Sequence, residues 1–324
     1  MMWLTLSKKS GPKKILIISL SNVGDVVLTC PVIDILRRDF PQAKIDLVVG
    51  PKAISLFEGN PNFSIKVFNK QALLSERFKW FLDLYQEHYD CVIDIRHTML
   101  PVLLWPKFNT RVFVLKAFKG HKKDSHLNRL QQVYHFDIIA DEKYAVLSTK
   151  ADEEFFNQEL GVHLNGKSFI VIAPGAAHPA KRWHTQGFAA LADYLSAKYQ
   201  VVFVGDAQDV EIVNDIKKHM STSALSLAGK TNLRQLAFVL KKSSWAITHD
   251  SGVMHLASYF NVPLVVLWGP TSLEHYAPWS KKSEIVRRNE KCLRCLDPKR
   301  DVAHNCMSYI EVDDVIKATI KIEQ

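Results

Sequence analysis

Residues 15–50 read "ILIISLSNVGDVVLTCPVIDILRRDFPQAKIDLVVG" and decide the fold class of this chain. The two ends of the stretch, residues 15–20 and 45–50, are short, apolar and rich in β-branched side chains, as buried strands are. The residues between them have a helical pattern, in which Pro31 predicts a kink or a division into two helices. The stretch therefore predicts a βαβ unit with two parallel strands.

The same alternation continues along the chain. Further strands are predicted at residues 65–68 and 91–95, with an amphipathic helix over about residues 73–88 between them. A second series begins with "FIVIA" at residue 169 and continues through "VVFVG", "WAIT" and "PLVVLWG", with helical segments between these strands. We therefore expect an α/β protein with two doubly wound, Rossmann-like parallel sheets, whose ligands bind at the carboxyl ends of the strands.

The length of 324 residues suits two domains of roughly 150 residues each. We predict an N-terminal domain over residues 1–160 and a C-terminal domain over residues 161–310. Residues 311–324 are predicted to form an amphipathic helix that packs back across the domain boundary. We find neither a membrane-spanning run of about 18 to 20 apolar residues nor the basic-then-apolar order of a secretory signal, so we expect a cytoplasmic protein.

The net charge of +9 favours an acidic partner. Nucleic acid, an anionic membrane surface and a phosphorylated substrate all fit that charge. Nucleic acid is the least favoured of the three, because the sequence has no recognised reader motif and no interleaving of aromatic with basic residues. The charge alone does not choose between the other two.

The motif "THDSGVMHLASYF", residues 248–260, follows a predicted strand and opens a helix. Asp250 or Ser251 suits the N-cap position, which leaves backbone N–H groups and the positive end of the helix dipole at the edge of the sheet. Phosphate binds readily at such a helix start, and His255 lies on the same helical face as Ser251 and adds a donor. The alternative is purely structural: a cap with a partly buried histidine.

Two other chemistries fit the same motif less well. A serine nucleophile requires the G-x-S-x-G elbow, and the glycine before Ser251 is missing. A metal site built on His249 and His255 lacks the i, i+4 spacing of helical zinc pairs and a nearby third ligand. The spacing excludes neither absolutely, but an anion site is favoured, and His249 has no assigned role.

Three further loops follow predicted strands. Residues 174–184, "PGAAHPAKRWH", combine turn-forming residues with the cations Lys181 and Arg182, which suits a diphosphate, although a basic surface turn is the alternative. Asp209, after "VVFVG", is placed to accept hydrogen bonds from ribose, although acids at helix starts also occur for dipole reasons alone. In the first half, Asp25 in "SNVGD" is either a helix cap or a general base.

Taken together, "ILIISLSNVGDVVLTCPVIDILRRDFPQAKIDLVV", "PGAAHPAKRW", "THDSGVMHLAS", "PLVVLWGPT" and the late "CLRC" and "HNCM" resemble glycosyltransferase family 9, the lipopolysaccharide heptosyltransferases. The resemblance covers about residues 15–50 and 169–310. It implies a GT-B fold, in which two Rossmann-like domains face a central cleft, with the acceptor in the N-terminal half and the nucleotide sugar in the C-terminal half. It also implies inverting transfer of heptose from ADP-heptose to the inner core of lipopolysaccharide, with no required metal cofactor.

The resemblance assigns roles residue by residue. Asp25 becomes the candidate general base, Lys181 a donor-phosphate ligand, and Asp209 an acid near the donor ribose. The predicted diphosphate site consists of Asp250, Ser251, Gly252 and His255. Two departures from the family pattern, "KRWH" for "KRWP" and "DSGVMHLA" for "DSGPMHLA", remove no charged group.

The resemblance also predicts partners. The acceptor is an anionic glycolipid, the lipid A–Kdo core, so the protein is expected to associate peripherally with the inner membrane. Lys119, Lys122 and Lys123 are candidates for that docking face and for acceptor binding. A transferase for a different nucleotide sugar and a non-catalytic nucleotide-sugar-binding protein are the alternatives.

One late cluster falls outside these roles. It consists of a C-x-x-C pair followed by H-x-C within fifteen residues: Cys292, Cys295, His304 and Cys306. Four soft ligands at this density permit a structural zinc site in a reducing compartment. Reduced thiols in an ordered loop are the alternative.

Overall fold

The computed structural model describes residue 6 and residues 11–110, 119–137, 142–287 and 306–324. The chain divides into two compact units, Met1–Leu147 and Ser148–Gln324, so the boundary comes earlier than the predicted residue 160. Among the described residues, none of the helices combines the length and apolar character needed to cross a membrane. The two units are described separately below.

The first unit contains a parallel sheet, in which the described strands have the order β3-β2-β1-β4-β5. Its strands are β1 (Lys14–Ile18), β2 (Lys44–Val49), β3 (Ser64–Val67), β4 (Cys91–Asp94) and β5 (Phe108–Asn109). Its helices are α1 (Val23–Val27), α2 (Cys30–Asp39), α3 (Ile54–Phe57), α4 (Leu74–Gln86), α5 (Leu100–Leu103) and α6 (Lys122–Gln131). The predicted division at Pro31 is confirmed, because this proline lies in the first turn of α2, where its missing N–H costs nothing.

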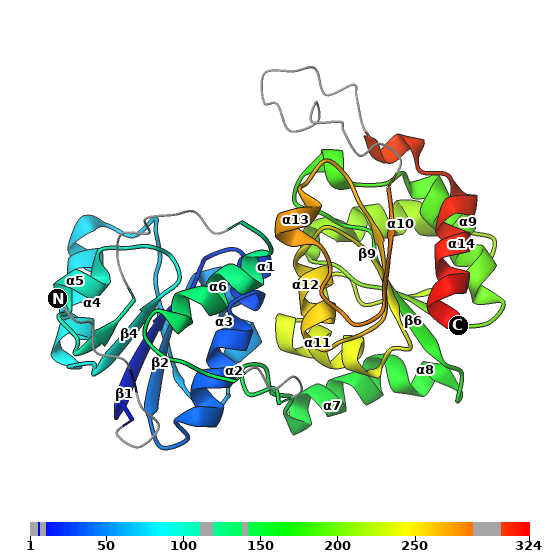
Figure 1. The fold of residues 1–324 in the computed structure, drawn as a ribbon. Helices are drawn as coiled ribbons and strands as arrows, with labels where there is room; N and C mark the ends of the chain where they lie inside the picture. Colours follow the sequence, from blue (N-terminus) through cyan, green and yellow to red (C-terminus); the bar gives the residue numbers. More distant parts are fainter. Residues whose placement is uncertain (1–5, 7–10, 111–118, 138–141, 288–305) are drawn as a thin grey trace. The chain divides into compact units, whose positions relative to one another are not determined.

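Helices cover both faces of this sheet. In Figure 1, α4 and α5 lie on one side, and α2, α3 and α6 lie on the other. The α4 side has its own apolar cluster, in which Leu84 packs with Leu16, Ile18, Val48 and Val92 from the strands. These side chains alternate along the strands with residues that face α2, as the two-residue period of a strand requires.

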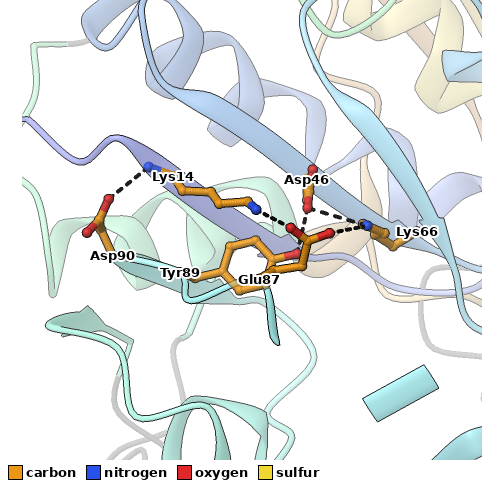
Figure 2. A network of polar contacts seen from close by, with 6 residues as sticks. All are labelled: Lys14, Asp46, Lys66, Glu87, Tyr89 and Asp90. Atoms are coloured by element: carbon orange, nitrogen blue, oxygen red, sulfur yellow. Dashed lines mark hydrogen bonds and ion pairs between the residues drawn. The ribbon is translucent and has the colours of Figure 1, made fainter. Parts of the chain in front are cut away.

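A network of ion pairs and hydrogen bonds links β1, β2 and β3 of this sheet (Figure 2). Glu87 pairs with Lys14 of β1 and, at 2.9 Å, with Lys66 of β3. The two lysines hold the pKa of Glu87 down at about 2. Tyr89 donates a 2.6 Å hydrogen bond to the buried carboxylate of Asp46 in β2. Lys14 and Lys66 are therefore both neutralised by Glu87.

The second unit contains a larger parallel sheet, in which the described strands have the order β11-β10-β9-β6-β7-β8. Its strands are β6 (Phe169–Ala173), β7 (Gln200–Phe203), β8 (Leu225–Ser226), β9 (Ala246–His249), β10 (Leu264–Leu267) and β11 (Ser283–Val286). Its α-helices are α7 (Lys150–Phe156), α8 (Val162–Leu164), α9 (Thr185–Ser196), α10 (Val210–His219), α11 (Leu233–Lys242), α12 (Gly252–Tyr259), α13 (Leu273–Tyr276) and α14 (Val312–Glu323).

Packing at the two ends of this unit explains its bounds. Helix α7 packs on α11, and Asp152 of α7 forms a 2.8 Å ion pair with Arg234 of α11. Residues 148–160 therefore fold with the second sheet and not with the first. The C-terminal helix α14 packs on α9, β10 and β11 of the same unit, beside α9 in Figure 1.

Candidate functional site

Two loops that carry predicted donor residues leave neighbouring strands. β6 pairs with β9 in a parallel register that sets Ala173 opposite Thr248. Because the carboxyl ends of parallel strands lie at one edge of the sheet, residues 174–184 and residues 249–251 emerge next to each other. The sheet order therefore brings together two motifs that lie more than sixty residues apart in the sequence.

His249, the last residue of β9, links these two loops. Its Nε2 accepts a 3.0 Å hydrogen bond from the backbone N–H of Trp183, and its Nδ1 lies 3.4 Å from the carbonyl oxygen of Gly175. The ring is fully buried, and burial lowers the pKa of His249 to about 4. A neutral imidazole with its proton on Nδ1 satisfies both contacts. His249 therefore holds both ends of the loop that carries Lys181.

Lys181 and Asp250 form an ion pair, with Nζ 2.7 Å from the Asp250 carboxylate. Lys181 ends a short 3₁₀ helix, Pro179–Lys181, whose N-cap His178 accepts a hydrogen bond from the backbone N–H of Ala180. Asp250 is almost fully buried, whereas the lysine side chain keeps 24% of its exposure. This pair favours a positioning role for Asp250, because a buried carboxylate repels a diphosphate but aims the ammonium group.

Ser251 occupies the N-cap position of α12, as the sequence predicts, but its side chain does not cap the helix. Its hydroxyl instead lies 3.1 Å from the hydroxyl of Thr248. The helix begins at Gly252, and His255 is buried one turn later, with its ring 6.4 Å from that of Tyr276. Asp250, the acidic member of the ion pair, thus comes just before the start of α12 in the chain.

Asp209 lies against the same loop. Its carboxylate accepts a 3.0 Å hydrogen bond from the backbone N–H of Asp206, and burial raises its pKa. A Cβ atom added to Gly175 would overlap this carboxylate, and one added to Gly205 would collide with the same side chain. Only glycine at these two positions permits such an approach. The structure therefore joins Asp209 to the loop of Lys181, while its role toward a ribose stays a prediction.

Asp25 belongs to the first unit. It lies in the first turn of α1, just after β1, and its carboxylate is half-buried. The described partner of that carboxylate is the side-chain amide of Asn22, at 3.2 Å. The N-cap position is Asn22, so Asp25 is not the cap of this helix. This leaves the general-base role as the remaining prediction for Asp25.

The other predicted residues are less informative. Lys119 is exposed, and Lys122 and Lys123 open α6, where Lys123 lies 3.4 Å from the carboxylate of Asp124. Three members of the proposed zinc cluster, Cys292, Cys295 and His304, lie outside the described residues. The fourth, Cys306, is buried at the start of a 3₁₀ helix, Cys306–Tyr309.

The sequence model of glycosyltransferase family 9 (heptosyltransferase) matches residues 114–304, which is more than half of the chain. The chain belongs to glycosyltransferase family 9. It is 27% identical over 330 residues to lipopolysaccharide heptosyltransferase 3 of Escherichia coli, covering 92% of this chain and 96% of that protein. Membership of this family makes the protein a glycosyltransferase and confirms the predicted family.

Solved structures show the same fold. The family 9 glycosyltransferase of Veillonella parvula superposes with a TM-score of 0.80 at 25% identity and covers 99% of this chain and 98% of its own. The ADP-heptose lipopolysaccharide heptosyltransferase II of E. coli gives 0.76 at 23% identity and covers 95% of this chain and 98% of its own. With two parallel-sheet units, this family 9 member has the predicted GT-B fold class.

The burial of His249 between Trp183 and Gly175 predicts that the folded protein loses stability in acid. Because the folded pKa is lower than the usual value near 6.5, its contribution is complete above pH 6.5 and is lost as pH falls toward 4, by up to about 3 kcal/mol. His249→Asn can still donate and accept a hydrogen bond but does not titrate. Urea unfolding between pH 7 and 4 should therefore show a shallower pH dependence for the variant.

His126 is a second buried histidine that titrates in the same pH range in both proteins. Its pKa is also lowered to about 4 by burial, so it adds to the same acid loss in both proteins. The difference between wild type and His249→Asn isolates the contribution of His249. Identical pH slopes for the two proteins would contradict the neutral, doubly hydrogen-bonded assignment.

Proposed function

We propose that this family 9 enzyme transfers heptose from ADP-heptose to the inner core of lipopolysaccharide, with inversion at the anomeric carbon. The observation that carries the proposal is the Lys181–Asp250 pair at the carboxyl edge of the second sheet, beside the start of α12. The relatives support the choice of sugar and acceptor, since they are ADP-heptose and lipopolysaccharide heptosyltransferases. The site supplies the charge that a nucleoside diphosphate leaving group requires.

In the second unit, electrostatic stabilisation assists the departure of the diphosphate. When the bond from the anomeric carbon to the diphosphate breaks, negative charge accumulates on the departing phosphate. The ammonium group of Lys181, held in place by Asp250, and the N-terminal end of α12 lie where they can stabilise that charge. His249 holds the loop that carries Lys181 through Trp183 and Gly175, so the stabilising groups are positioned before the reaction begins.

The acceptor end requires a base. Asp25 takes the proton from the attacking acceptor hydroxyl, which approaches the anomeric carbon on the face opposite the diphosphate. A half-buried carboxylate in the first turn of α1 is accessible to such a hydroxyl. No protein nucleophile takes part, because inversion requires a single displacement.

The transfer is tested with purified protein, a panel of nucleotide sugars and truncated lipopolysaccharide acceptors, with the product linkage identified by mass spectrometry. ADP-heptose should be the preferred donor. Asp25→Asn should lower kcat by roughly 10²- to 10⁴-fold while leaving the Kd for ADP-heptose unchanged, because an amide cannot take the proton. Equal losses in turnover and donor affinity would count against the base assignment.

Lys181→Ala should weaken ADP binding by about tenfold or more, because a charge-assisted contact to phosphate is lost. The change also leaves Asp250 buried without its cation, so stability must be measured beside affinity. Lys181→Ala/Asp250→Asn should recover stability but not affinity, which separates the two effects. Lys198→Ala is the matched control, because its 2.7 Å ion pair with Glu323 lies on the exposed surface. Unchanged ADP affinity in Lys181→Ala would remove the phosphate role.

The acceptor is a membrane glycolipid, and Lys119, Lys122 and Lys123 form the proposed docking face of the first unit. Reversing all three to Glu should lower binding to vesicles with anionic phospholipids by about tenfold or more, because each lysine near such a surface contributes about 1 kcal/mol. The control reverses three exposed lysines of the second unit, Lys217, Lys218 and Lys282. Equal vesicle binding by the two triple variants would show that Lys119, Lys122 and Lys123 do not form a specific docking face.

A further inference from the structure

The outward side of α4 carries a stripe of large apolar side chains. Leu74, Phe78, Leu82 and Tyr85 are spaced by four, four and three residues, which aligns them along one face of the helix. All four side chains are exposed, Leu74 by 80% and Phe78 by 62%. The helix packs on the sheet through a different face, that of the buried Leu84. Helix α4 therefore has a second apolar face, which the fold of the first unit leaves in solvent.

Helix α5 and the residues beside it extend this apolar surface. Met99 and Leu103 are exposed, and Trp105, just after α5, is 86% exposed. Met99 and Leu103 line the same cavity as Trp80 and Phe81 of α4, so the two helices adjoin, on one side of the sheet in Figure 1. We call the α4 stripe together with Met99, Leu103 and Trp105 the α4–α5 face. An exposed apolar surface of this extent marks an interaction site.

The backbone at Trp105 gives independent support for an interaction role. Trp105 has a φ of 49°, in the left-handed region that a bulky side chain seldom occupies. Pro106, the next residue, is buried, so the chain is anchored there while the indole ring stays in solvent. A strained conformation that holds a large ring in water is unfavourable by itself. It therefore points to a partner that receives the ring.

The charges around the α4–α5 face are mainly positive. Residues 69–86 and 96–107, which carry this face, contain two carboxylates, Glu76 and Asp83. Glu76 is engaged locally, because its carboxylate accepts a 2.9 Å hydrogen bond from the backbone N–H of Leu73. The same residues contain five cations, none of which forms an ion pair with a carboxylate of the described residues: Lys70, Arg77, Lys79, Arg96 and Lys107. An apolar surface with such a cationic rim complements a membrane that contains anionic phospholipids.

A second copy of this chain fits the same face less well. Two copies related by a twofold axis would bring the cationic rim of each against that of the other, and like charges oppose such a contact. The aromatic side chains of the face, Trp105 and Tyr85, also favour the boundary between lipid and water, because each has an apolar ring and a polar group that stays hydrated. The charge and the aromatic composition together favour a lipid surface as the partner.

We propose that the α4–α5 face docks on the surface of a membrane that contains anionic phospholipids. Leu74, Phe78 and Trp105 enter the boundary between headgroups and acyl chains, and the surrounding cations contact lipid phosphates. The lysines at the start of α6 and before it act through charge alone, so the two surfaces contribute to docking in different ways. The inference rests on the proposed function in one respect, because a glycolipid acceptor lies in such a membrane.

The central test is binding to vesicles of phosphatidylethanolamine and phosphatidylglycerol, measured by cosedimentation at low and at high salt. Leu74→Gln/Phe78→Gln/Leu82→Gln should weaken binding by about tenfold or more at both salt concentrations, because apolar burial does not depend on charge. Reversing the lysines at the start of α6 and before it should weaken binding at low salt only, because salt screens exposed charges. The three α4 positions are exposed and glutamine is a good helix former, so the variant should stay folded.

Val162→Gln/Tyr194→Gln/Ile320→Gln is the matched control, because it makes the same kind of change at three exposed apolar side chains of the second unit. This control should bind vesicles as the wild type does. Vesicle binding at high salt that is equal in the α4 variant and the control would overturn the proposal.

Fluorescence quenching by lipids with brominated acyl chains tests insertion directly. Bromine quenches an indole that reaches the acyl chains, and the other described tryptophans are buried or half-buried. The wild type should therefore lose more fluorescence on these vesicles than Trp105→Phe, with unbrominated vesicles as the reference. Equal quenching of the two proteins would show that Trp105 stays outside the bilayer and would contradict the proposed insertion.

Sedimentation velocity without lipid tests the alternative partner. The wild type and the α4 variant should have the same oligomeric state. A wild-type dimer that the three α4 substitutions dissociate, with vesicle binding unchanged, would assign the face to a second copy and overturn the lipid assignment.

Transfer assays separate this inference from the proposed function. The α4 variant should retain wild-type kcat and KM with a deacylated acceptor in solution, and should lose transfer to an acceptor embedded in vesicles. Vesicle binding that the α4 substitutions weaken, without any transfer from ADP-heptose by the wild type, would keep the docking face and refute the reaction. Normal transfer with equal vesicle binding by the α4 variant and the control would do the reverse.

Discussion

The backbone hydrogen bonds between β6 and β9 hold the donor end of the second unit together. This pairing sets the lysine loop beside the start of α12, although the two are far apart in the sequence. The parallel register also fixes which residues meet, since a shift by one position would turn His249 to the other face of the sheet. The clamp on Trp183 and Gly175 and the pair of Lys181 with Asp250 both depend on it.

Burial gives His249, the last residue of β9, and Asp250, the residue after it, different roles. His249 is buried as a neutral imidazole, so it can bridge two backbone groups without the cost of a buried charge. Asp250 is buried as one member of an ion pair, and its partner Lys181 keeps some exposure. A carboxylate buried beside an accessible ammonium group fixes the direction of the positive charge. The same ion pair therefore stabilises the loop and, in the proposed reaction, prepares it for an anionic donor.

The first unit distributes its charges unevenly along one sheet. Glu87 neutralises Lys14, at the amino end of β1, and Lys66 of β3. At the carboxyl edge, Arg77 and Arg96 approach Phe68 without a described carboxylate partner.

The order of strands and helices follows from sequence alone, because buried strands and amphipathic helices have distinct apolar periods. Pro31 predicts a kink or a division of the helix for another local reason, its missing backbone N–H. The spacing of the loop motifs indicates the family. The edge strands β5 and β8 have two residues each, too few for that period to be recognised. The boundary at residue 147 depended on α7 packing against α11, which no local pattern encodes.

The candidate donor residues were also visible in sequence, but their contacts were not. Sequence placed Lys181 and Asp250 after two different strands, and only the sheet order made them an ion pair. His249 had no role until burial and two backbone contacts defined one. The residues that surround Phe68 come from the segment after β3, from α4 and from the segment after β4, and they carry no common motif. Local patterns determine elements and candidate chemistry, whereas pairing, burial and cavities depend on contacts between distant segments, which only the tertiary structure decides.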